Sequence, residues 1–522
     1  MSGDEQLIEQ AFPGDYTDIT KCGEGTFGVV YRVKGQRGDQ YKAVKIYPTD
    51  TDAEGLAVDV VREIASLVFL DDHENIITIN RFSVAHDTPA IIMPAMTHSL
   101  YEYLQNSATR QCDDEALRNM GICKSICHGI AYMHAHGFMH RDLKPGNVLI
   151  NNDASEVKIS DFGSTRRYIE GQLMTMNVTT LFYRAPEILF GSSAYALSVD
   201  VWSLACTCAE VMMGGTGLFR FLPSTGTSDG HAQVMAIFNL IGTNDMEWAM
   251  HPDYTHFNPN VMPRSLANLL PAHMKLNCLQ SCPLDFIDVI ISGLDANPSR
   301  RICAQRLNDT MRSLLHKPGD DAPPLKTRGG DAIDPKPPAA YLPKSDDYSS
   351  KRTCVIDWLV QVHHEHGFNG ATLHLAVDVF DRYSDKIPVP ASEMQLTAIV
   401  ALMLASKLNE TSELDLRCMI AHCNQYTTSD FVDMEKRILS GLDGGIMILS
   451  EAAFELSQIS DVVLRNVVQY LFESAMLRGP RAYLRMKRAK RIRNRAGIRN
   501  INEMFKLSTY ASMRKKFGNE MD

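Results

Sequence analysis

A run of 24 residues, 317–340 (KPGDDAPPLKTRGGDAIDPKPPAA), separates two stretches of the chain that follow different patterns. The run is rich in Pro, Gly and charged residues and has almost no large apolar side chain, so it cannot contribute much to a packed core. A chain of 522 residues has room for about three domain-sized units, and at least two. The run therefore predicts a flexible linker between separately packed regions.

The hydrophobic period changes along the chain: the first stretch begins with an alternating pattern and continues with a helical one, and the second stretch is helical throughout. Residues 16–95 alternate apolar and polar side chains in short runs with Gly turns, such as GVVYRV and QYKAVKIY, which predicts an antiparallel sheet. Residues 56–70 interrupt this pattern with apolar residues at helical spacing, and from about residue 100 to 315 the signals are mostly helical. Beyond the linker, amphipathic helices joined by short turns predict an all-α bundle.

The charge of the chain is unevenly distributed. The net charge is -10, which argues against a dedicated nucleic-acid binder. From residue 451 onward, however, 15 Lys and Arg face 7 Asp and Glu, which leaves -18 for residues 1–450. The basic run 485–495 (RMKRAKRIRNR) suggests nuclear import, contact with nucleic acid or docking onto an acidic protein surface. A solvated basic helix is the alternative.

Several classes of protein are disfavoured. The beginning, MSGDEQLIEQ, lacks the basic and apolar regions of a signal peptide, and the longest apolar stretch, 396–405, is far shorter than the roughly 20 residues that span a bilayer. The 12 Cys include no Cys-x-x-Cys pair, so we expect reduced thiols, in the nucleus, the cytoplasm or both. A metal site at His363, His364 and His366 is disfavoured, because adjacent residues of a helix face different sides.

Five short motifs follow one another in a fixed order before the linker. They are GEGTFGVV (residues 23–30), AVK ending at Lys45, HRDLKPGN (140–147), DFG (161–163) and APE (185–187). The glycines Gly23, Gly25 and Gly28 would let the backbone approach phosphates. A helix after the AVK strand carries Glu63, which can pair with Lys45. The ordered set resembles the signature of protein kinases.

This resemblance implies transfer of a phosphoryl group from ATP with Mg²⁺, a reaction that needs positioning and charge neutralisation more than covalent chemistry. Asp142 would accept or orient the proton of the substrate hydroxyl, and Lys144 would neutralise charge on the moving group. Asn147 and Asp161 would hold Mg²⁺. The alternative is a pseudokinase, but such proteins usually lack the strand Lys, the catalytic-loop Asp or the metal Asp, and this sequence has all three.

Residues 16–316 resemble cyclin-dependent kinases in particular. The matching segments are AVDVVREIASL (57–67), YRAPEILFG (183–191), DVWSLACTCAEV (200–211) and IFNLIGT (237–243). The resemblance places the adenine pocket at Val30, Ala43, Met93, Pro94, Met96 and Leu149. A proline at the first hinge position is compatible with ATP, because that position contributes only its carbonyl group and proline retains one.

The same resemblance predicts regulatory residues. Thr175 matches the phosphorylation site of the activation loop, and Arg62, Arg141 and Arg166 match the cluster that binds its phosphate. A phosphate adds about two negative charges, which several Arg side chains would neutralise while ordering the loop. A solvated loop threonine is the alternative.

Other positions match or depart from the family pattern. Thr180 matches the threonine that bridges Asp142 and Lys144. In the glycine loop Thr26 could be an inhibitory phosphorylation site, whereas Phe27 has no hydroxyl group. Thr179 replaces the usual Val of the pocket for a substrate proline, so a preference for Ser/Thr-Pro sites is predicted less firmly.

Residues 341–450 resemble the first cyclin box of A- and B-type cyclins. The matching segments are RTCVIDWLVQVHHEHGF, ATLHLAVDVFDRYS, MQLTAIVALMLASK and DMEKRIL. Lys407 and Glu435 match the cyclin residues that bind kinase backbone beside the regulatory helix. Val355, Trp358 and Gln395 match a patch that docks substrates, although the patch is altered by a Lys in place of a Met. An unrelated five-helix bundle is the alternative.

We therefore expect an α+β bilobal protein kinase fold followed by an all-α cyclin-box domain. The expected bounds are a kinase domain at 12–316, with lobes at about 12–96 and 97–316, a linker at 317–340, a cyclin box at 341–450 and a partial helical extension with a basic tail at 451–522. The predicted function is a serine/threonine kinase that phosphorylates protein substrates in cell-cycle control.

The cyclin box would dock within the chain and activate the kinase in cis, with reciprocal docking in a swapped dimer as the competing arrangement. A separate activating kinase could phosphorylate Thr175, and we expect no association with membranes. Two alternative functions stay open: a transcription-type cyclin-dependent kinase, and a non-catalytic module that sequesters kinase or cyclin partners.

Overall fold

The computed structural model of the chain describes residues 3–25, 28–35, 40–48, 55–71, 73–84, 88–106, 115–169, 172–175, 180–219, 229–241, 284–315, 346–411 and 416–446. The predicted linker and the basic extension lie outside these residues. The chain forms two compact units. The first unit consists of Met1–Asp50 and Arg62–Gly330, and the second of Thr51–Val61 and Asp331–Asp522.

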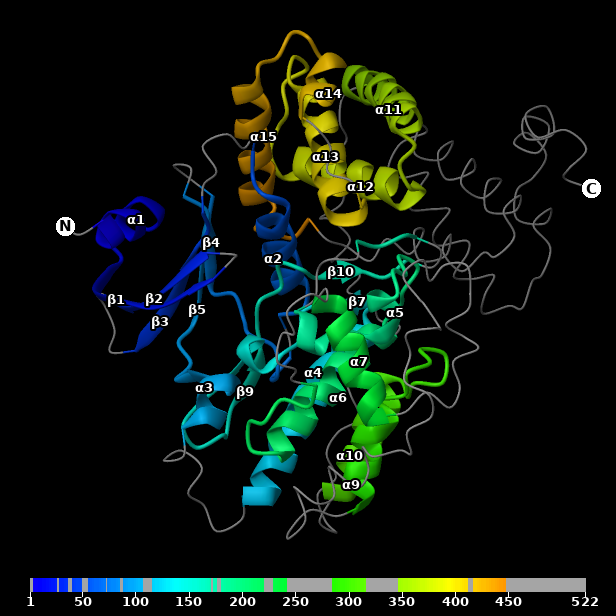
Figure 1. The fold of residues 1–522 in the computed structure, drawn as a ribbon. Coiled ribbons are helices and arrows are strands. Elements are labelled where there is room, and N and C mark those ends of the chain that lie inside the picture. Colours follow the sequence, from blue (N-terminus) through cyan, green and yellow to red (C-terminus); the bar gives the residue numbers. More distant parts are fainter. Residues whose placement is uncertain are drawn as a thin grey trace, which may run out of the picture. The chain divides into compact units, whose positions relative to one another are not determined.

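The first unit begins with a five-stranded antiparallel sheet in the order β1-β2-β3-β5-β4. Figure 1 shows these strands in blue, beside the helices that come after them in the chain. The alternation of apolar and polar residues predicted this sheet, and the prediction is confirmed. The strands are β1 (Tyr16–Gly25), β2 (Gly28–Gly35), β3 (Tyr41–Ile46), β4 (Arg81–Ser83) and β5 (Ala90–Pro94).

Two helices belong to this part of the chain. Helix α1 (Gly3–Ala11) packs on β1 and β3 and contributes Ile8 and Ala11 to a buried apolar cluster with Val33 and Val44 of the sheet. Helix α2 (Val58–Phe69) is the helix predicted between the strands. Its first four residues, 58–61, belong to the second unit and the rest to the first.

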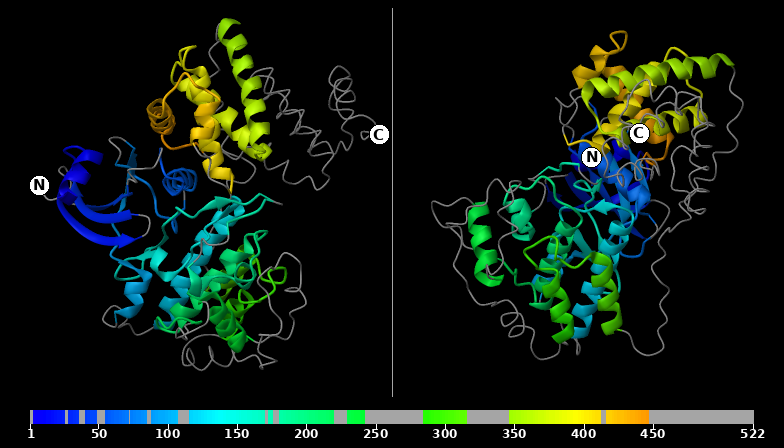
Figure 2. Two further views of the ribbon diagram at one scale, coloured as in Figure 1. Left: turned by 45° about the horizontal axis from the view of Figure 1, so that its top comes forward. Right: turned by 90° about the vertical axis from the view of Figure 1, so that its right-hand side faces the viewer.

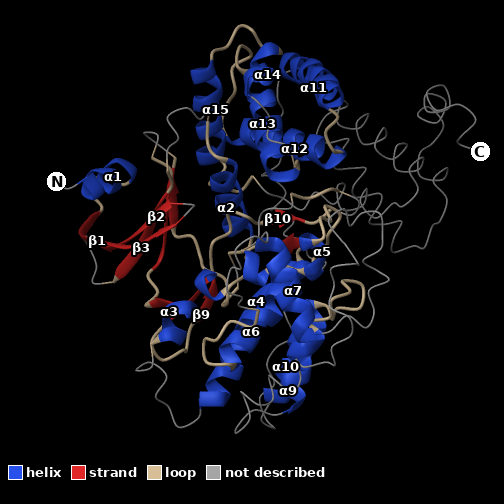
Figure 3. Cartoon of the chain, viewed as in Figure 1, coloured by secondary structure: helices blue, strands red, loops and turns tan. Residues whose placement is uncertain are grey.

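The remainder of the first unit is mainly helical. Helix α6 is buried almost completely, and α4 packs against both α6 and α10. Figure 3 shows these helices in blue with only short strands between them. The helices are α3 (Leu100–Gln105), α4 (Glu115–Ala135), α5 (Pro186–Leu189), α6 (Ser198–Met212), α7 (Asp229–Ile241), α9 (Leu284–Ser292) and α10 (Ala304–Leu315).

Short strands hold the loops that carry the sequence motifs. The order β6-β8-β9 forms one small sheet and β10-β7 another. They place the motif loops next to one another at the end of α4, so the site depends on backbone pairing of residues far apart in sequence. These strands are β6 (His98–Ser99), β7 (Phe138–Met139), β8 (Val148–Ile150), β9 (Val157–Ile159) and β10 (Arg166–Arg167).

The second unit is helical, as the sequence predicted. Its central helix α13 has 14 buried residues out of 16 and packs against α11, α12 and α15. The two views of Figure 2 show these helices in colours from yellow-green (α11) to orange (α15). The buried pair Arg352–Asp381, with N–O distances of 2.7 Å, joins α11 to α12. The helices are α11 (Asp346–His366), α12 (Gly370–Lys386), α13 (Met394–Asn409), α14 (Leu416–Ala421) and α15 (Thr428–Gly441).

Two kinds of feature are absent from the described residues. No helix in those ranges is both long and apolar enough to cross a membrane. The same ranges contain no group of three or more His, Cys, Asp and Glu side chains that could hold a metal ion.

Candidate active site

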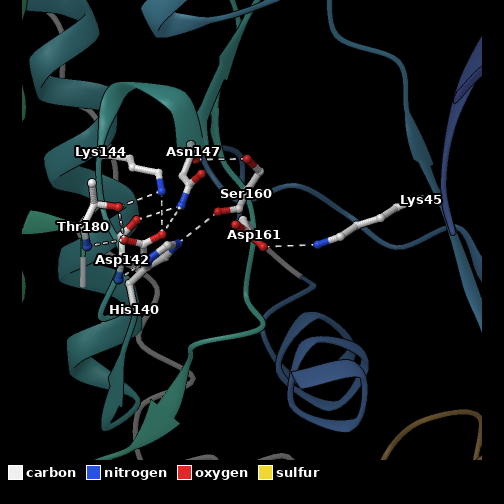
Figure 4. Close-up of polar contacts among 8 residues, drawn as sticks. All are labelled: Lys45, His140, Asp142, Lys144, Asn147, Ser160, Asp161 and Thr180. Atoms are coloured by element: carbon white, nitrogen blue, oxygen red, sulfur yellow. Dashed lines mark hydrogen bonds and ion pairs between the residues drawn. The ribbon is translucent and has the colours of Figure 1, made fainter. Parts of the chain in front are cut away.

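The carboxylate of Asp142 is fixed by four hydrogen bonds (Figure 4). Its Oδ1 accepts from the backbone N–H of Thr180 at 2.9 Å and from the Thr180 hydroxyl at 2.8 Å. Its Oδ2 accepts from Lys144 Nζ at 2.8 Å and from Asn147 Nδ2 at 3.0 Å. Because Lys144 also donates to the Thr180 hydroxyl at 2.8 Å, the side chains form one connected network. The residues predicted to surround the reacting hydroxyl therefore do lie together.

The loop before Asp142 is anchored by a buried carboxylate on α6. Asp200 Oδ2 accepts from the backbone N–H of His140, and its Oδ1 accepts from the backbone N–H of Arg141, both at 2.8 Å. Although burial opposes ionisation, the hydrogen bonds from His134 and from this backbone lower the pKa of Asp200. Arg141 has a φ of 67°, a conformation that non-glycine residues adopt only where the surroundings hold them.

Lys45 stands between two carboxylates. Its Nζ lies 2.7 Å from Glu63 Oε2 on α2 and 3.1 Å from Asp161 Oδ1. Burial alone would lower the pKa of Lys45, but the two negative charges outweigh it and raise that pKa. Burial raises the pKa of Glu63, and the Lys45 charge only partly offsets this. The side chain of Lys45 is 9% exposed, so its charge is little screened by water.

The strand pairing places the predicted adenine pocket. Ala43 pairs with Met93 and Lys42 with Pro94 across β3 and β5, while Val30 pairs with Lys45 across β2 and β3. The side chains of the predicted pocket are apolar and half-buried, apart from Met93, which is buried. The half-buried ones are Val30, Ala43, Pro94, Met96 and Leu149.

The glycine loop connects β1 to β2. An added Cβ at Gly23 or Gly25 would meet nothing within 4 Å, so the backbone there is open to a ligand. Gly28 has a φ of 132°, and a Cβ there would collide with the carbonyl oxygen of Ile46. Thr26 lies outside the described residues.

Asn147 and Asp161 fit a hard cation. Asn147 uses its Nδ2 inside the protein, donating to the backbone oxygen of Asp142 at 2.8 Å and to the Asp142 carboxylate. This leaves the amide oxygen as the end suited to a cation. Asp161 adds a carboxylate that is partly exposed. Amide and carboxylate oxygens are ligands of the kind that Mg²⁺ prefers.

Thr175 is held by a buried arginine. Its hydroxyl accepts from Arg141 Nη1 at 3.1 Å, and its carbonyl oxygen accepts from the Tyr195 hydroxyl at 2.6 Å. Arg141 is 1% exposed, and its Nη2 has no hydrogen-bond partner among the described atoms. The other two predicted arginines are on β10 (Arg166, also buried) and on α2 (Arg62, half-buried). A buried guanidinium with spare N–H groups is suited to receive an anion.

In the second unit, Lys407 and Glu435 bind the two backbone polar groups of Leu56. Lys407 Nζ donates to the carbonyl oxygen of Leu56 at 2.6 Å, and Glu435 Oε2 accepts the N–H of Leu56 at 2.9 Å. The two side chains also pair with each other at 2.5 Å. Residues from α13 and α15 thus bind the backbone just before α2. We call this arrangement the Leu56 clamp.

The predicted docking patch lines a shallow groove of about 580 Å³. Val355 and Trp358 of α11 and Gln395 of α13 all contribute to it, so the three residues lie on one surface. Cys354 and Tyr426 extend the lining, and neither was singled out from the sequence.

Four further residues at these places were missed by sequence reasoning. Tyr47 lies two positions after Lys45, and its ring centroid lies 5.1 Å from Lys45 Nζ. Tyr195, Asp200 and Gly55 support Thr175, the catalytic loop and the Leu56 clamp, respectively. Asp200 lies within the quoted segment DVWSLACTCAEV and could have been found there, whereas the other three carry no motif signal.

The comparisons with known proteins agree with this architecture. The family model described as "Protein kinase domain" matches residues 16–311, and the one described as "Cyclin, N-terminal domain" matches residues 333–446. Among solved structures, a chain of the yeast RNA Pol II CTD kinase CTDK-1 complex is 24% identical, with a TM-score of 0.50. The match covers 58% of this chain and 93% of that chain, and at this identity it bears on the fold alone.

Proposed function

Because the chain belongs to the protein kinase family and carries an N-terminal cyclin domain after its kinase domain, we propose that it is a cyclin-dependent serine/threonine kinase activated in cis by its own cyclin box. The observation that carries the proposal is the Leu56 clamp. Lys407 and Glu435 bind the backbone N–H and C=O of Leu56, two residues before α2, the helix that presents Glu63 to Lys45.

The chemistry follows from the geometry of the first unit. Asp142, held by two donors on each oxygen, orients the substrate hydroxyl and takes up its proton as the new O–P bond forms and the bond to the leaving ADP breaks. Lys144 supplies a positive charge 2.8 Å from Asp142 that offsets charge on the transferred group.

Lys45 and the metal ligands would hold the nucleotide. Lys45 is kept in place by Glu63 and presents its ammonium group to the ATP phosphates. Asn147 and Asp161 would hold Mg²⁺, which when bound neutralises phosphate charge. Activity should therefore be lost when EDTA is added and return with excess Mg²⁺.

Cis activation follows from fixing the start of α2. An α-helix is stiff over 12 residues, so holding Leu56 restricts where Glu63 can lie. The predicted linker of 24 residues, outside the described ranges, would have an r.m.s. span of roughly 25–30 Å. Tethering at that length gives an effective concentration of the order of mM. A separate cyclin would then be unnecessary.

Phosphorylation of Thr175 would complete activation. The phosphate would accept hydrogen bonds from the guanidinium N–H groups of Arg141, whose Nη1 already donates to the Thr175 hydroxyl at 3.1 Å. Arg166 and Arg62 would contribute further charge by the resemblance to the family. An activating kinase for Thr175 and an inhibitory phosphorylation at Thr26 are part of the proposal.

For the substrate, we propose Ser/Thr-Pro sites in proteins of the cell cycle. Arg184, which matches the family pattern, is half-buried; burial lowers its pKa, and the charge of Asp142 only partly offsets this. Thr179 lies outside the described residues. A transcription-type kinase is the second candidate, because the yeast structure with the similar fold is titled a CTD kinase.

The location and the basic segment complete the proposal. We propose that the protein acts in the nucleus, the cytoplasm or both. The run 485–495 would serve nuclear import or an electrostatic contact. It lies outside the described residues.

The decisive experiment is a kinase assay on the purified full chain without any added cyclin. Histone, a Ser-Pro peptide and a CTD peptide separate the two candidate roles. Asp142→Asn should lose about 10²–10⁴-fold in kcat, because the proton acceptor is removed, while its thermal unfolding stays close to that of the wild type. If the wild-type chain is inactive on all three substrates, with and without phosphate on Thr175, the kinase proposal fails and a sequestering role replaces it.

A further inference from the structure

Gly55 directly precedes Leu56, and the N–H that Glu435 binds belongs to the peptide bond between these two residues. Its φ is 110°, in the region that L-amino acids with a side chain rarely adopt. A Cβ built on Gly55 would lie 2.7 Å from Glu435 Oε2 and 3.7 Å from Lys407 Nζ. Real Cβ atoms almost never approach another heavy atom as closely as the first of these distances, so a side chain at position 55 forces something to move.

The Glu435 carboxylate cannot move without breaking the clamp. Glu435 is 0% exposed and lies on α15 among buried neighbours. One of its oxygens pairs with Lys407 at 2.5 Å, and the other accepts the Leu56 N–H at 2.9 Å. Displacing Oε2 would leave a buried carboxylate and a backbone N–H without this bond, which is costly in a protein interior.

We infer that Gly55 is a positioning residue for the kinase. It allows the buried Glu435 and its partner Lys407 to close on the backbone of Leu56 and so fixes the start of α2. The inference rests on the proposed cis activation and adds a residue that neither the motifs nor the family resemblance identified. A Cβ at position 55 excludes the closed clamp for two reasons, the strained φ and the contact with Glu435.

The test is a double-mutant cycle in the full chain with Gly55→Ala and Glu435→Ala, measured as kcat/KM for a Ser-Pro peptide. Gly55→Ala alone should lose at least about tenfold, whereas in the Glu435→Ala background it should cost less than about twofold, because the clamp is already open. Ala57→Ser is the matched control, since Ala57 lies in the same segment and is exposed. It should stay within about twofold of the wild type.

Thermal unfolding of each variant checks that the fold is retained, and Gly55→Asn provides a second variant, since Asn tolerates positive φ better than Ala. Full activity of both Gly55 variants, with Glu435→Ala impaired, overturns the inference and leaves cis activation standing. An undiminished Gly55→Ala defect in the Glu435→Ala background also overturns it, because Gly55 would then act elsewhere. If Glu435→Ala is as active as the wild type, cis activation fails and the inference fails with it.

Discussion

Two Lys–Glu pairs with buried glutamates, one in each unit, have different roles. In the first unit Lys45 pairs with Glu63 at 2.7 Å and also meets the carboxylate of Asp161. In the second unit Lys407 pairs with Glu435 at 2.5 Å, and together they bind the N–H and carbonyl oxygen of Leu56. Both glutamates are almost fully buried, at 1% and 0% exposure.

The difference lies in the third partner. The Lys45 pair faces a second carboxylate, that of Asp161, so the three side chains together carry a net negative charge. Such a charge suits a site that binds a metal cation and a charged ligand. The Leu56 clamp faces neutral backbone, where Leu56 offers a donor to Glu435 and an acceptor to Lys407. A Lys–Glu pair therefore belongs to a reactive centre in the first unit, whereas in the second unit a pair of the same residue types binds backbone.

Breaking the Lys45 pair should have the largest effect. Lys45→Met removes the charge that would contact the nucleotide and leaves Glu63 buried beside Asp161, so we expect kcat/KM to fall by roughly 10²–10³-fold. Removing one partner of a buried ion pair should also lower the free energy of unfolding by about 3–5 kcal/mol. A peptide phosphorylation assay and thermal unfolding measure the two effects.

Lys42→Met is the control for this prediction. Lys42 lies on the same strand and is half-buried, but the motif does not include it. If it lost as much activity as Lys45→Met, the special role of the Lys45 pair would be contradicted.

Breaking the Leu56 clamp should have a smaller effect, because it acts on the site only through α2. The pair Lys407→Ala and Glu435→Ala should reduce kcat/KM by at least about tenfold while the catalytic side chains remain intact. Arg437→Ala is the matched control on α15, since Arg437 forms an exposed pair with Glu393 at 2.9 Å. Such surface pairs contribute about 0–1 kcal/mol, so activity should change little. Equal activity of the clamp variant and this control would contradict a role of the Leu56 clamp in activity.

The region just beyond α2 relies on neutral histidine instead of an ion pair. Burial, together with the nearby His128 and His136, lowers the pKa of His73 to about 3. The unfolded chain therefore binds the proton more readily than the folded one below about pH 6.5. This stability is fully present above pH 6.5 and is lost as the pH falls toward 3, at no more than ~1.4 kcal/mol per pH unit, and less because the ring is only half-buried.

His73→Gln should flatten the dependence of the unfolding free energy on pH between 6.5 and 4, measured by denaturant titration. An unchanged slope would show that His73 is not protonated on unfolding in this range. The variant keeps a polar side chain near the backbone N–H of Asn75, which His73 accepts at 3.1 Å.

The smallest loss of activity is expected for substitutions of Tyr47. This residue gives the Lys45 pair an aromatic neighbour. Tyr47→Phe keeps the ring 5.1 Å from Lys45 Nζ and removes the hydroxyl group that lowers the pKa of Glu63. We expect a loss of about two- to fivefold in kcat/KM. Tyr47→Leu, which also removes the ring, should lose more, and the reverse order would contradict a role for the aromatic face.

The sequence predicted those features that are written in motifs and periodicity. Lys45, Glu63, Asp142 and Asp161 stand out because the chemistry demands those side chains in an ordered set of motifs, and the sheet and helices follow from the hydrophobic period. Lys407 and Glu435 were found only through family resemblance, since a Lys and a Glu on amphipathic helices are otherwise ordinary.

Other features depend on backbone conformation and on contacts between residues distant in sequence. Gly55 is one glycine among 33, and only its φ and its distance to Glu435 reveal a role. Tyr195 reaches Thr175 across 20 residues. Helix α1 precedes the predicted start of the kinase domain, and its packing on the sheet was not anticipated.

The Leu56 clamp binds backbone groups and not a side chain, and this makes the chain more sensitive to length than to composition at the start of α2. Each residue added to an α-helix turns the rest of the helix by about 100° and shifts it by about 1.5 Å. A single insertion between Val58 and Glu63 would thus rotate the Glu63 carboxylate away from Lys45 while leaving Leu56 in the clamp. Side chains along this stretch can be exchanged within the limits of packing, but the number of residues between Leu56 and Glu63 is fixed.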